Sequence, residues 1–120
     1  MARRPEVGLA RVYDAIEAGE GRRVLVDRLW PRGLKRTDPR IGQWLPAIAP
    51  SNELRRWYGH KAALTHEFRE RYLEELGEPE TAEAFVELTA LADAGGLVLT
   101  TATREFEISH AAFLRELLNR

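Results

Sequence analysis

The chain of 120 residues has the length of a domain with one hydrophobic core, so we expect a single domain over residues 1–120. Its 44% hydrophobic and 31% charged residues lie close to the averages for globular proteins, which argues against wholesale disorder. The lack of cysteine excludes disulfides and thiolate metal sites. No apolar run approaches the ~20 residues that span a bilayer, and the first residues lack a signal-peptide run, so we expect a cytoplasmic protein with no membrane partner.

The net charge of −1 combines two regions of opposite charge. Residues 22–40 hold seven basic residues against two acidic ones, and residues 67–93 hold nine acidic residues against two basic ones. The acidic region is typical of a solvated helix face. The arginines of the basic region alternate with strand and turn residues, so they are placed to converge on an anion.

Two strands are predicted in the first third of the chain. Residues 9–13 contain β-forming side chains and lead into a polar connection. Residues 23–33 read as a nearly continuous apolar strand, covered on both faces, that ends in an arginine-rich loop. Prolines and a glycine divide residues 36–50 into short segments, so we expect one helical turn around residues 41–45 and otherwise irregular structure.

The rest of the chain shows the periodicity of amphipathic helices, interrupted by one strand. The predicted elements are helices over residues 51–58, 64–76, 79–92 and 109–118 and a strand over residues 97–99. Ser51 and Ser109 are placed to cap the first and last of these helices, and Gly59 to end the first. We expect Leu73 and Val86 on the buried faces of the second and third helices.

This order of elements predicts an α/β fold of three layers, in which a small parallel or mixed sheet is flanked by helices. A right-handed crossover between the second and last strands places their carboxyl ends at the same edge of the sheet. Residues 28–32 and 100–104 are then neighbours at the edge where open α/β sheets bind ligands.

Asp27, Arg28 and Arg32 are the leading candidates for chemistry. In an alternating strand the side chains of Asp27 and Arg28 face opposite layers, and burial of either charge requires a partner. Asp27 paired with a distant arginine would be a purely structural feature. Alternatively, the guanidinium group of Arg28 or Arg32 holds a phosphate or carboxylate in bidentate geometry.

His110 lies on the apolar stripe of the last helix but in its first turn. A helix N-terminus disfavours the protonated imidazole, so we expect a neutral ring that accepts a proton or orients a ligand. The alternative is a hydrogen-bonded core histidine. Thr100, Thr101 and Thr103 either direct hydroxyls into the same pocket or are ordinary strand residues.

Other kinds of site receive less support. His60 and His66 are six residues apart, a spacing that does not align two ligands on a helix, so we expect no metal and no cofactor. The chain has neither cysteine nor a glycine-flanked serine elbow, the commoner covalent nucleophiles. The tryptophans beside the basic region either stack on nucleic-acid bases or fill the core.

Several segments are similar to a known family. They are residues 23–33, 44–45, 49–51, 54–60 and 68–72. Together they resemble the motifs of the domain-of-unknown-function 488 family, in its YeaO-like branch, a family named for having no established function. That branch usually carries an aromatic residue where this chain has Thr101 and a histidine where it has Ile108, whereas His110 matches. The resemblance therefore weakens the case for catalysis more than the case for binding.

Two hypotheses follow. In the first, a site for a small anion, phosphate or carboxylate, lies at the carboxyl edge of the sheet, and an enzyme would use His110 there as an acid–base group and Asp27 to orient the arginines. The ligand-binding candidates are Arg28, Trp30, Arg32, Thr101, Thr103 and Arg104. In the second, the chain is a non-catalytic binding or regulatory module that recruits a protein or nucleic acid through its basic loop.

Overall fold

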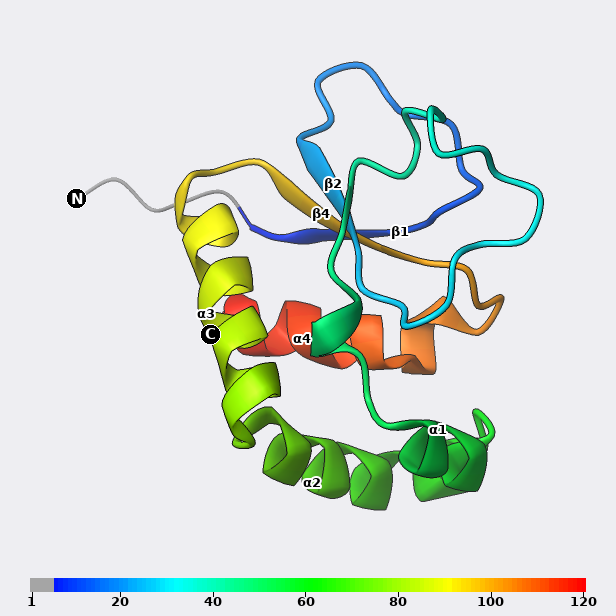
Figure 1. Cartoon of the computed structure of the whole chain (residues 1–120), viewed down its shortest axis with the longest axis vertical. Coiled ribbons are helices and arrows are strands. Elements are labelled where there is room, and N and C mark those ends of the chain that lie inside the picture. Colours follow the sequence, from blue (N-terminus) through cyan, green and yellow to red (C-terminus); the bar gives the residue numbers. More distant parts are fainter. Residues whose placement is uncertain (1–5) are drawn as a thin grey trace.

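The computed structural model describes residues 6–120, which form a four-stranded parallel sheet and four α-helices (Figure 1). The strands are β1 (Gly8–Arg11), β2 (Arg22–Leu25), β3 (Gln43–Trp44) and β4 (Leu97–Thr101). The helices are α1 (Asn52–Tyr58), α2 (Thr65–Leu76), α3 (Pro79–Asp93) and α4 (His110–Leu118). The predicted α/β class and the parallel sheet are confirmed.

The order of strands across the sheet is β1-β4-β2-β3, so β4 lies between the two strands predicted at the start of the chain. Arg11 pairs with Thr101, and Leu25 pairs with Thr100. The carboxyl ends of β1, β2 and β4 therefore meet at one edge of the sheet, as the crossover argument predicted.

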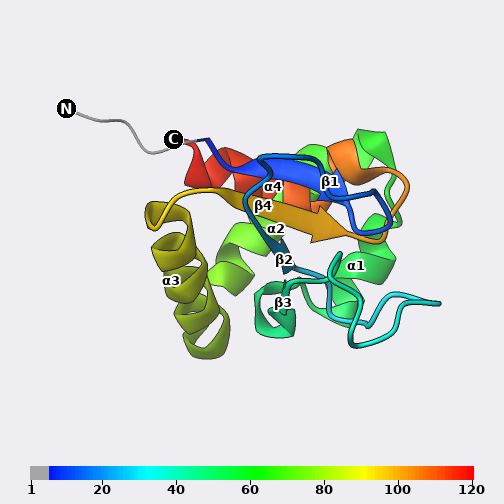
Figure 2. The same ribbon diagram turned by 90° about the horizontal axis from the view of Figure 1, so that it is seen from above.

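The two faces of the sheet fill separate apolar clusters. Val24 and Leu99 face the larger cluster, which the four helices build around Tyr72. Figure 2, in which the molecule is seen from above, shows β1 and β4 in front of α2 and α4. On the other face Leu25 packs with Val12 and other side chains from the connecting segments. The three-layer arrangement is thus confirmed, with connecting segments forming the third layer.

The strand predicted over residues 23–33 is much shorter in the structure. β2 ends at Leu25, and the backbone N–H of Val26 makes a further bond to β4 by donating to the Thr100 carbonyl at 3.1 Å. Beyond it the chain leaves the sheet, and Leu29, expected in a buried strand, is 59% exposed. The apolar residues of this segment therefore pack in two different places. Val24 and Val26 enter the larger core cluster, while Trp30 packs edge-on against Trp44 with 5.3 Å between ring centroids.

The helical turn predicted around residues 41–45 was wrong, because Gln43–Trp44 pair with β2 as the edge strand β3. Gly42 makes this pairing sterically feasible. Its φ of 63° is in the left-handed region, and a Cβ atom there would overlap the carbonyl oxygen of Arg23. The short helical turn follows one step later, at Pro46–Ile48.

The predicted helices and caps are present, with two exceptions in their buried faces. Ser51 Oγ accepts from the Leu54 N–H at 3.1 Å, and Ser109 Oγ accepts from the Ala112 N–H at 3.3 Å. Leu73 and Val86, predicted to be buried, are 48% and 68% exposed. The buried rows of α2 and α3 run through side chains four residues apart, Phe68 and Tyr72 on α2 and Ala84, Leu88 and Ala92 on α3.

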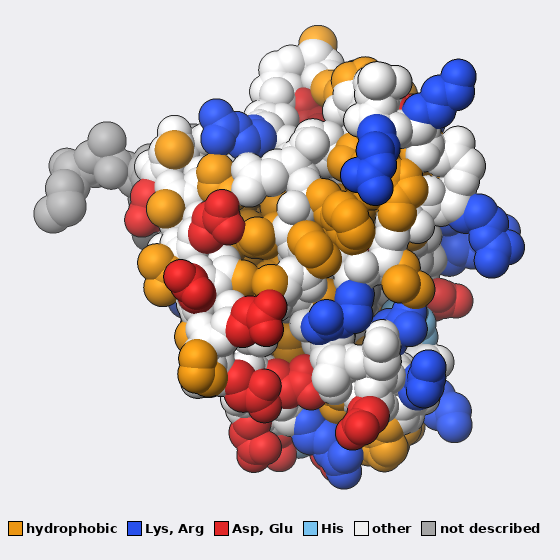
Figure 3. Space-filling model, in the orientation of Figure 1, with side chains coloured by type: hydrophobic (Ala, Val, Ile, Leu, Met, Phe, Trp, Pro, Cys, Tyr) orange, Lys and Arg blue, Asp and Glu red, His pale blue; other side chains and the backbone are white. Residues whose placement is uncertain are grey.

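The charged regions occupy different parts of the surface. Figure 3 shows acidic side chains over α2 and α3, while many Lys and Arg side chains lie on the side of residues 28–40 and α1. In the part of the chain that the structure describes, no helix has the length and apolar character needed to cross a membrane.

Candidate functional site

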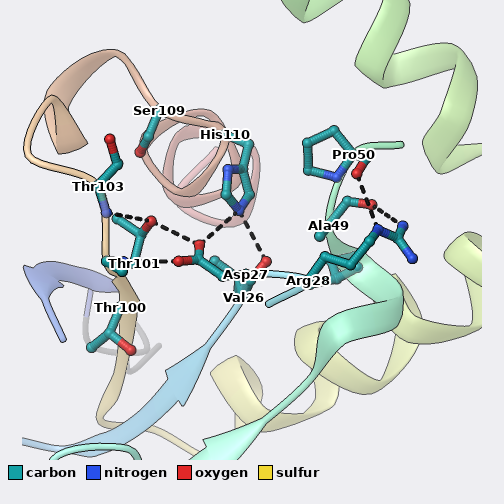
Figure 4. Close-up of polar contacts among 12 residues, drawn as sticks. Val26, Asp27, Arg28, Ala49, Pro50, Thr100, Thr101, Thr103, Ser109 and His110 are labelled. Carbon is teal, nitrogen blue, oxygen red and sulfur yellow. Dashed lines mark hydrogen bonds and ion pairs between the residues drawn. The ribbon is translucent and has the colours of Figure 1, made fainter. Parts of the chain in front are cut away.

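Asp27 connects the ends of β2 and β4 (Figure 4). Its Oδ1 accepts from the Thr101 hydroxyl at 2.7 Å, and its Oδ2 accepts from the backbone N–H of Ala102 at 2.8 Å. Neither Arg28 nor Arg32 forms a hydrogen bond or an ion pair with it, so the structure corrects the expectation that Asp27 orients these arginines. Both carboxylate oxygens are already bonded, which makes Asp27 a brace between the two strand ends.

His110 begins α4 and faces the same strand ends. Its Nε2 lies 2.9 Å from the Val26 carbonyl and 3.4 Å from Asp27 Oδ1. A carbonyl only accepts, so Nε2 carries the proton. Nδ1 has no partner within residues 6–120, and since no buried side-chain nitrogen there lacks a partner, Nδ1 contacts open space.

Burial lowers the pKa of His110, and the negative charge of Asp27 opposes this shift only in part. The ring is therefore neutral at pH 7, with a fixed N–H on Nε2 and a free lone pair on Nδ1. This is the neutral ring that the sequence analysis expected at His110. Its main physical cause is desolvation, whereas the sequence argument relied on the helix N-terminus.

The side chain of Arg28, beyond the end of β2, points away from that of Asp27 (Figure 4). Its Nη2 and Nε donate to the carbonyls of Ala49 and Pro50, at 3.1 and 3.4 Å. These bonds fix the plane of the guanidinium group and leave Nη1 without a protein acceptor in residues 6–120.

Residues 27–36, which we call the rim loop, are held by their own contacts. The indole N–H of Trp30 donates to the Leu34 carbonyl at 2.7 Å, and the Tyr13 hydroxyl donates to the Arg32 carbonyl at 2.8 Å. The Arg32 side chain itself is exposed and has no ion-pair partner among the described residues. The loop thus holds Arg32 by its backbone and leaves its charge available.

These segments surround a cavity of about 310 Å³. Of the residues predicted for the site, those that line it are Asp27, Arg28, Trp30, Arg32, Thr101, Thr103 and His110. Arg104, also predicted, is exposed and does not line the cavity. The hydroxyl of Thr101 is engaged by Asp27 and by the Thr103 N–H, so Thr101 acts through the brace.

Arg55 and His60 also line the cavity and were not predicted for the site. Arg55 enters from α1, where its Nη2 donates to Asn52 Oδ1 at 3.3 Å. His60 follows the left-handed Gly59 and is the non-glycine residue with a positive φ, 55°, in the described part of the chain. Its Nε2 lies 3.4 Å from Thr103 Oγ1. The signal for both was their place in the segment 54–60, which resembles a family motif.

The chemical character of the cavity follows from these contacts. Three arginines line it and keep guanidinium N–H groups that have no acceptor in residues 6–120, whereas the one carboxylate that lines it there accepts a hydrogen bond at both oxygens. The imidazole of His110 adds a lone pair. Such an arrangement suits an anion that also carries a hydrogen-bond donor.

Comparison with known proteins gives a consistent family relationship. A family model described as the inactive DUF488-N3 subclade matches residues 6–120. The uncharacterized proteins Rv3073c of Mycobacterium tuberculosis and Mb3100c of Mycobacterium bovis are each 45% identical to the chain over 119 residues, which is 99% of this chain and 98% of each relative. The uncharacterized protein YeaO of Escherichia coli is 49% identical over 70 residues, 58% of this chain and 61% of YeaO. No solved structure matches the chain.

Proposed function

Because the chain belongs to the domain-of-unknown-function 488 family and is YeaO-like, with a matching subclade described as inactive, we propose that it binds a small anion without transforming it. The anion is a phosphate or a carboxylate, held at the carboxyl edge of the sheet. We also propose that the protein works in the cytoplasm, because it has no cysteine for the disulfides that are common in secreted domains.

One observation carries this proposal. Arg28, Arg32 and Arg55 line one cavity, and each keeps guanidinium N–H groups that no acceptor in residues 6–120 takes. Guanidinium groups bind oxyanions through charge-assisted, bidentate hydrogen bonds, and their convergence supports a ligand of opposite charge.

The same contacts support binding over catalysis. Both oxygens of Asp27 accept hydrogen bonds, from the Thr101 hydroxyl and the Ala102 N–H, so this carboxylate is engaged in joining the two strand ends. We therefore assign Asp27 a structural role. His110 takes the role of a hydrogen-bonding group, and Thr103 and His60 close the wall next to it.

Isothermal titration calorimetry with inorganic phosphate and with acetate tests the proposal. We expect one of these ions to bind at one site, and Arg32→Ala and Arg55→Ala to weaken its affinity about ten- to a hundredfold, because each removes charge-assisted hydrogen bonds. Arg56→Ala is the matched control, because Arg56 is an exposed neighbour on α1 outside the cavity. Equal losses in all three variants, or no binding of either ion by the unmodified chain, would refute the site.

The non-catalytic part has its own test. We expect p-nitrophenyl phosphate to stabilise the chain in a thermal-shift assay, by ~2.7 kcal/mol at a hundred times its dissociation constant, and to remain intact. Release of nitrophenolate at a rate that Arg32→Ala abolishes would show turnover at this site.

A further inference from the structure

The residues that line the cavity include two chemically different groups. We call Arg28, Arg32 and Arg55 the cationic wall. The apolar wall is the group Leu29, Pro31, Ala49, Pro50 and Phe68, none of which carries a polar side-chain atom. An inorganic oxyanion uses only the first wall, because apolar carbon atoms offer it no hydrogen bond and displace its water.

Leu29 is the most informative residue of the apolar wall. It lies between Arg28 and Trp30 in the rim loop and is 59% exposed although it lines the cavity. The hydrogen bonds of Trp30 and of the Arg32 carbonyl hold the rim loop in place, so Leu29 is presented by a fixed backbone. A pre-positioned apolar group loses little conformational freedom when a ligand covers it.

The size of the cavity agrees with an organic ligand. At about 310 Å³ it reaches the lower end of the range, ~300–1,000 Å³, that is typical of sites for organic molecules, and it exceeds what a bare phosphate or acetate ion fills. Resting on the anion-binding function proposed above, we infer that the ligand is an amphipathic organic anion. Its phosphate or carboxylate contacts the arginines, and a ring or branched alkyl body covers Leu29 and the prolines.

Calorimetry with three probes tests this inference: phenyl phosphate, inorganic phosphate and phenol. We expect phenyl phosphate to bind about ten- to a hundredfold more tightly than inorganic phosphate, because its ring buries apolar surface, and phenol to bind more weakly than phenyl phosphate. Equal affinity for the two phosphates would overturn the inference and leave the anion site standing. If neither phosphate binds and acetate does not bind either, the anion-binding function fails as well.

A pair of leucine variants assigns the effect to the cavity. Leu29→Ser is expected to reduce the preference for phenyl phosphate about tenfold while the affinity for inorganic phosphate stays within about twofold. Leu73→Ser is the matched control, because Leu73 is a similarly exposed leucine on α2, outside the cavity, and we expect it to change neither affinity. A preference that survives Leu29→Ser unchanged would contradict the assignment of this wall.

Discussion

The carboxylate of Asp27 has a different role from the one that a buried acid suggests in a sequence. Asp27 was expected either in an ion pair with a distant arginine or as a group orienting Arg28 and Arg32. Instead it accepts from Thr101 and from the backbone of Ala102, and it lies near His110. These partners are about 75 residues away in the chain, so no local pattern indicates them.

We predict that Asp27→Ala lowers the free energy of unfolding by about 2–3 kcal/mol. The substitution leaves the Thr101 hydroxyl and the Ala102 N–H without their shared acceptor in a largely buried place. Urea unfolding measures the change. Asp14→Ala is the comparison, because the exposed Asp14 also accepts a backbone N–H but at a surface turn, and its loss should cost under about 1 kcal/mol. Similar costs for the two variants would show that Asp27 is not a brace.

His110 makes the folded chain less stable as the pH falls. Burial lowers its pKa in the folded chain below the unfolded value of ~6.5. The unfolded chain therefore binds a proton before the folded chain does, and stability is lost as the pH falls from ~6.5 toward the lower folded pKa. Above ~6.5 this contribution is constant.

We predict that His110→Gln removes this part of the pH dependence. The variant is less stable at pH 7, because the bond to the Val26 carbonyl is altered, but its stability should fall less than that of the unmodified chain on acidification below pH ~6.5. Thermal unfolding across this pH range gives both slopes. Parallel curves would mean that His110 is not held in its neutral form.

At the scale of elements, the features that depend only on nearby residues, such as helix caps, could be predicted from the sequence. Ser51 and Ser109 cap α1 and α4 as expected, because a cap needs only a side chain and the next turn of the same helix. β3 was missed because Gln43–Trp44 become a strand only through pairing with β2. Leu29 was misplaced for a related reason, since an apolar run does not distinguish a buried strand from a loop that lines a cavity.

A comparison of Gly42 and Gly33 distinguishes the cost of a left-handed backbone from the cost of a steric overlap. Gly42 and Gly33 both have positive φ, 63° and 83°, but a Cβ atom would overlap the Arg23 backbone only at Gly42, and at Gly33 it would meet nothing within 4 Å. We predict that Gly42→Ala costs at least about 3 kcal/mol by separating β3 from β2. Gly33→Ala should cost about 1 kcal/mol, the strain of a left-handed alanine alone. Chemical denaturation of both variants checks the difference, and equal costs would contradict the pairing of β3 described above.

At the scale of the whole molecule, the position of the cavity was predictable, although not all of the residues that line it were. Parallel strands bring their carboxyl ends together whatever their sequence, so the meeting of residues 28–32 with Thr101 and Thr103 followed from topology. Arg55 reaches the cavity from α1 and His60 from the segment directly after it, whereas the exposed Arg104 does not line the cavity. Which side chains enter a cavity depends on loop conformation, which periodicity does not encode.

The uneven charge of the surface provides a final test of whether recognition is local. Glu80, Glu83 and Glu87 lie on α3 and do not line the cavity. Replacing all three with glutamine raises the formal net charge by three, from −1 to +2. At physiological salt the screening length is ~8 Å, so we predict that the affinity for phenyl phosphate changes by less than about twofold.

Single-stranded DNA serves as the contrasting ligand for this triple variant. A long polyanion responds to the overall charge of the surface, so its weak binding should become stronger in the triple variant and should fall steeply with salt. If phenyl phosphate gains affinity in step with the DNA, the bound anion is attracted by the general field of the protein. If only the DNA gains affinity, the arrangement of the guanidinium groups in the cavity determines anion binding. The arginines of the cavity are the same in the unmodified chain and in the triple variant.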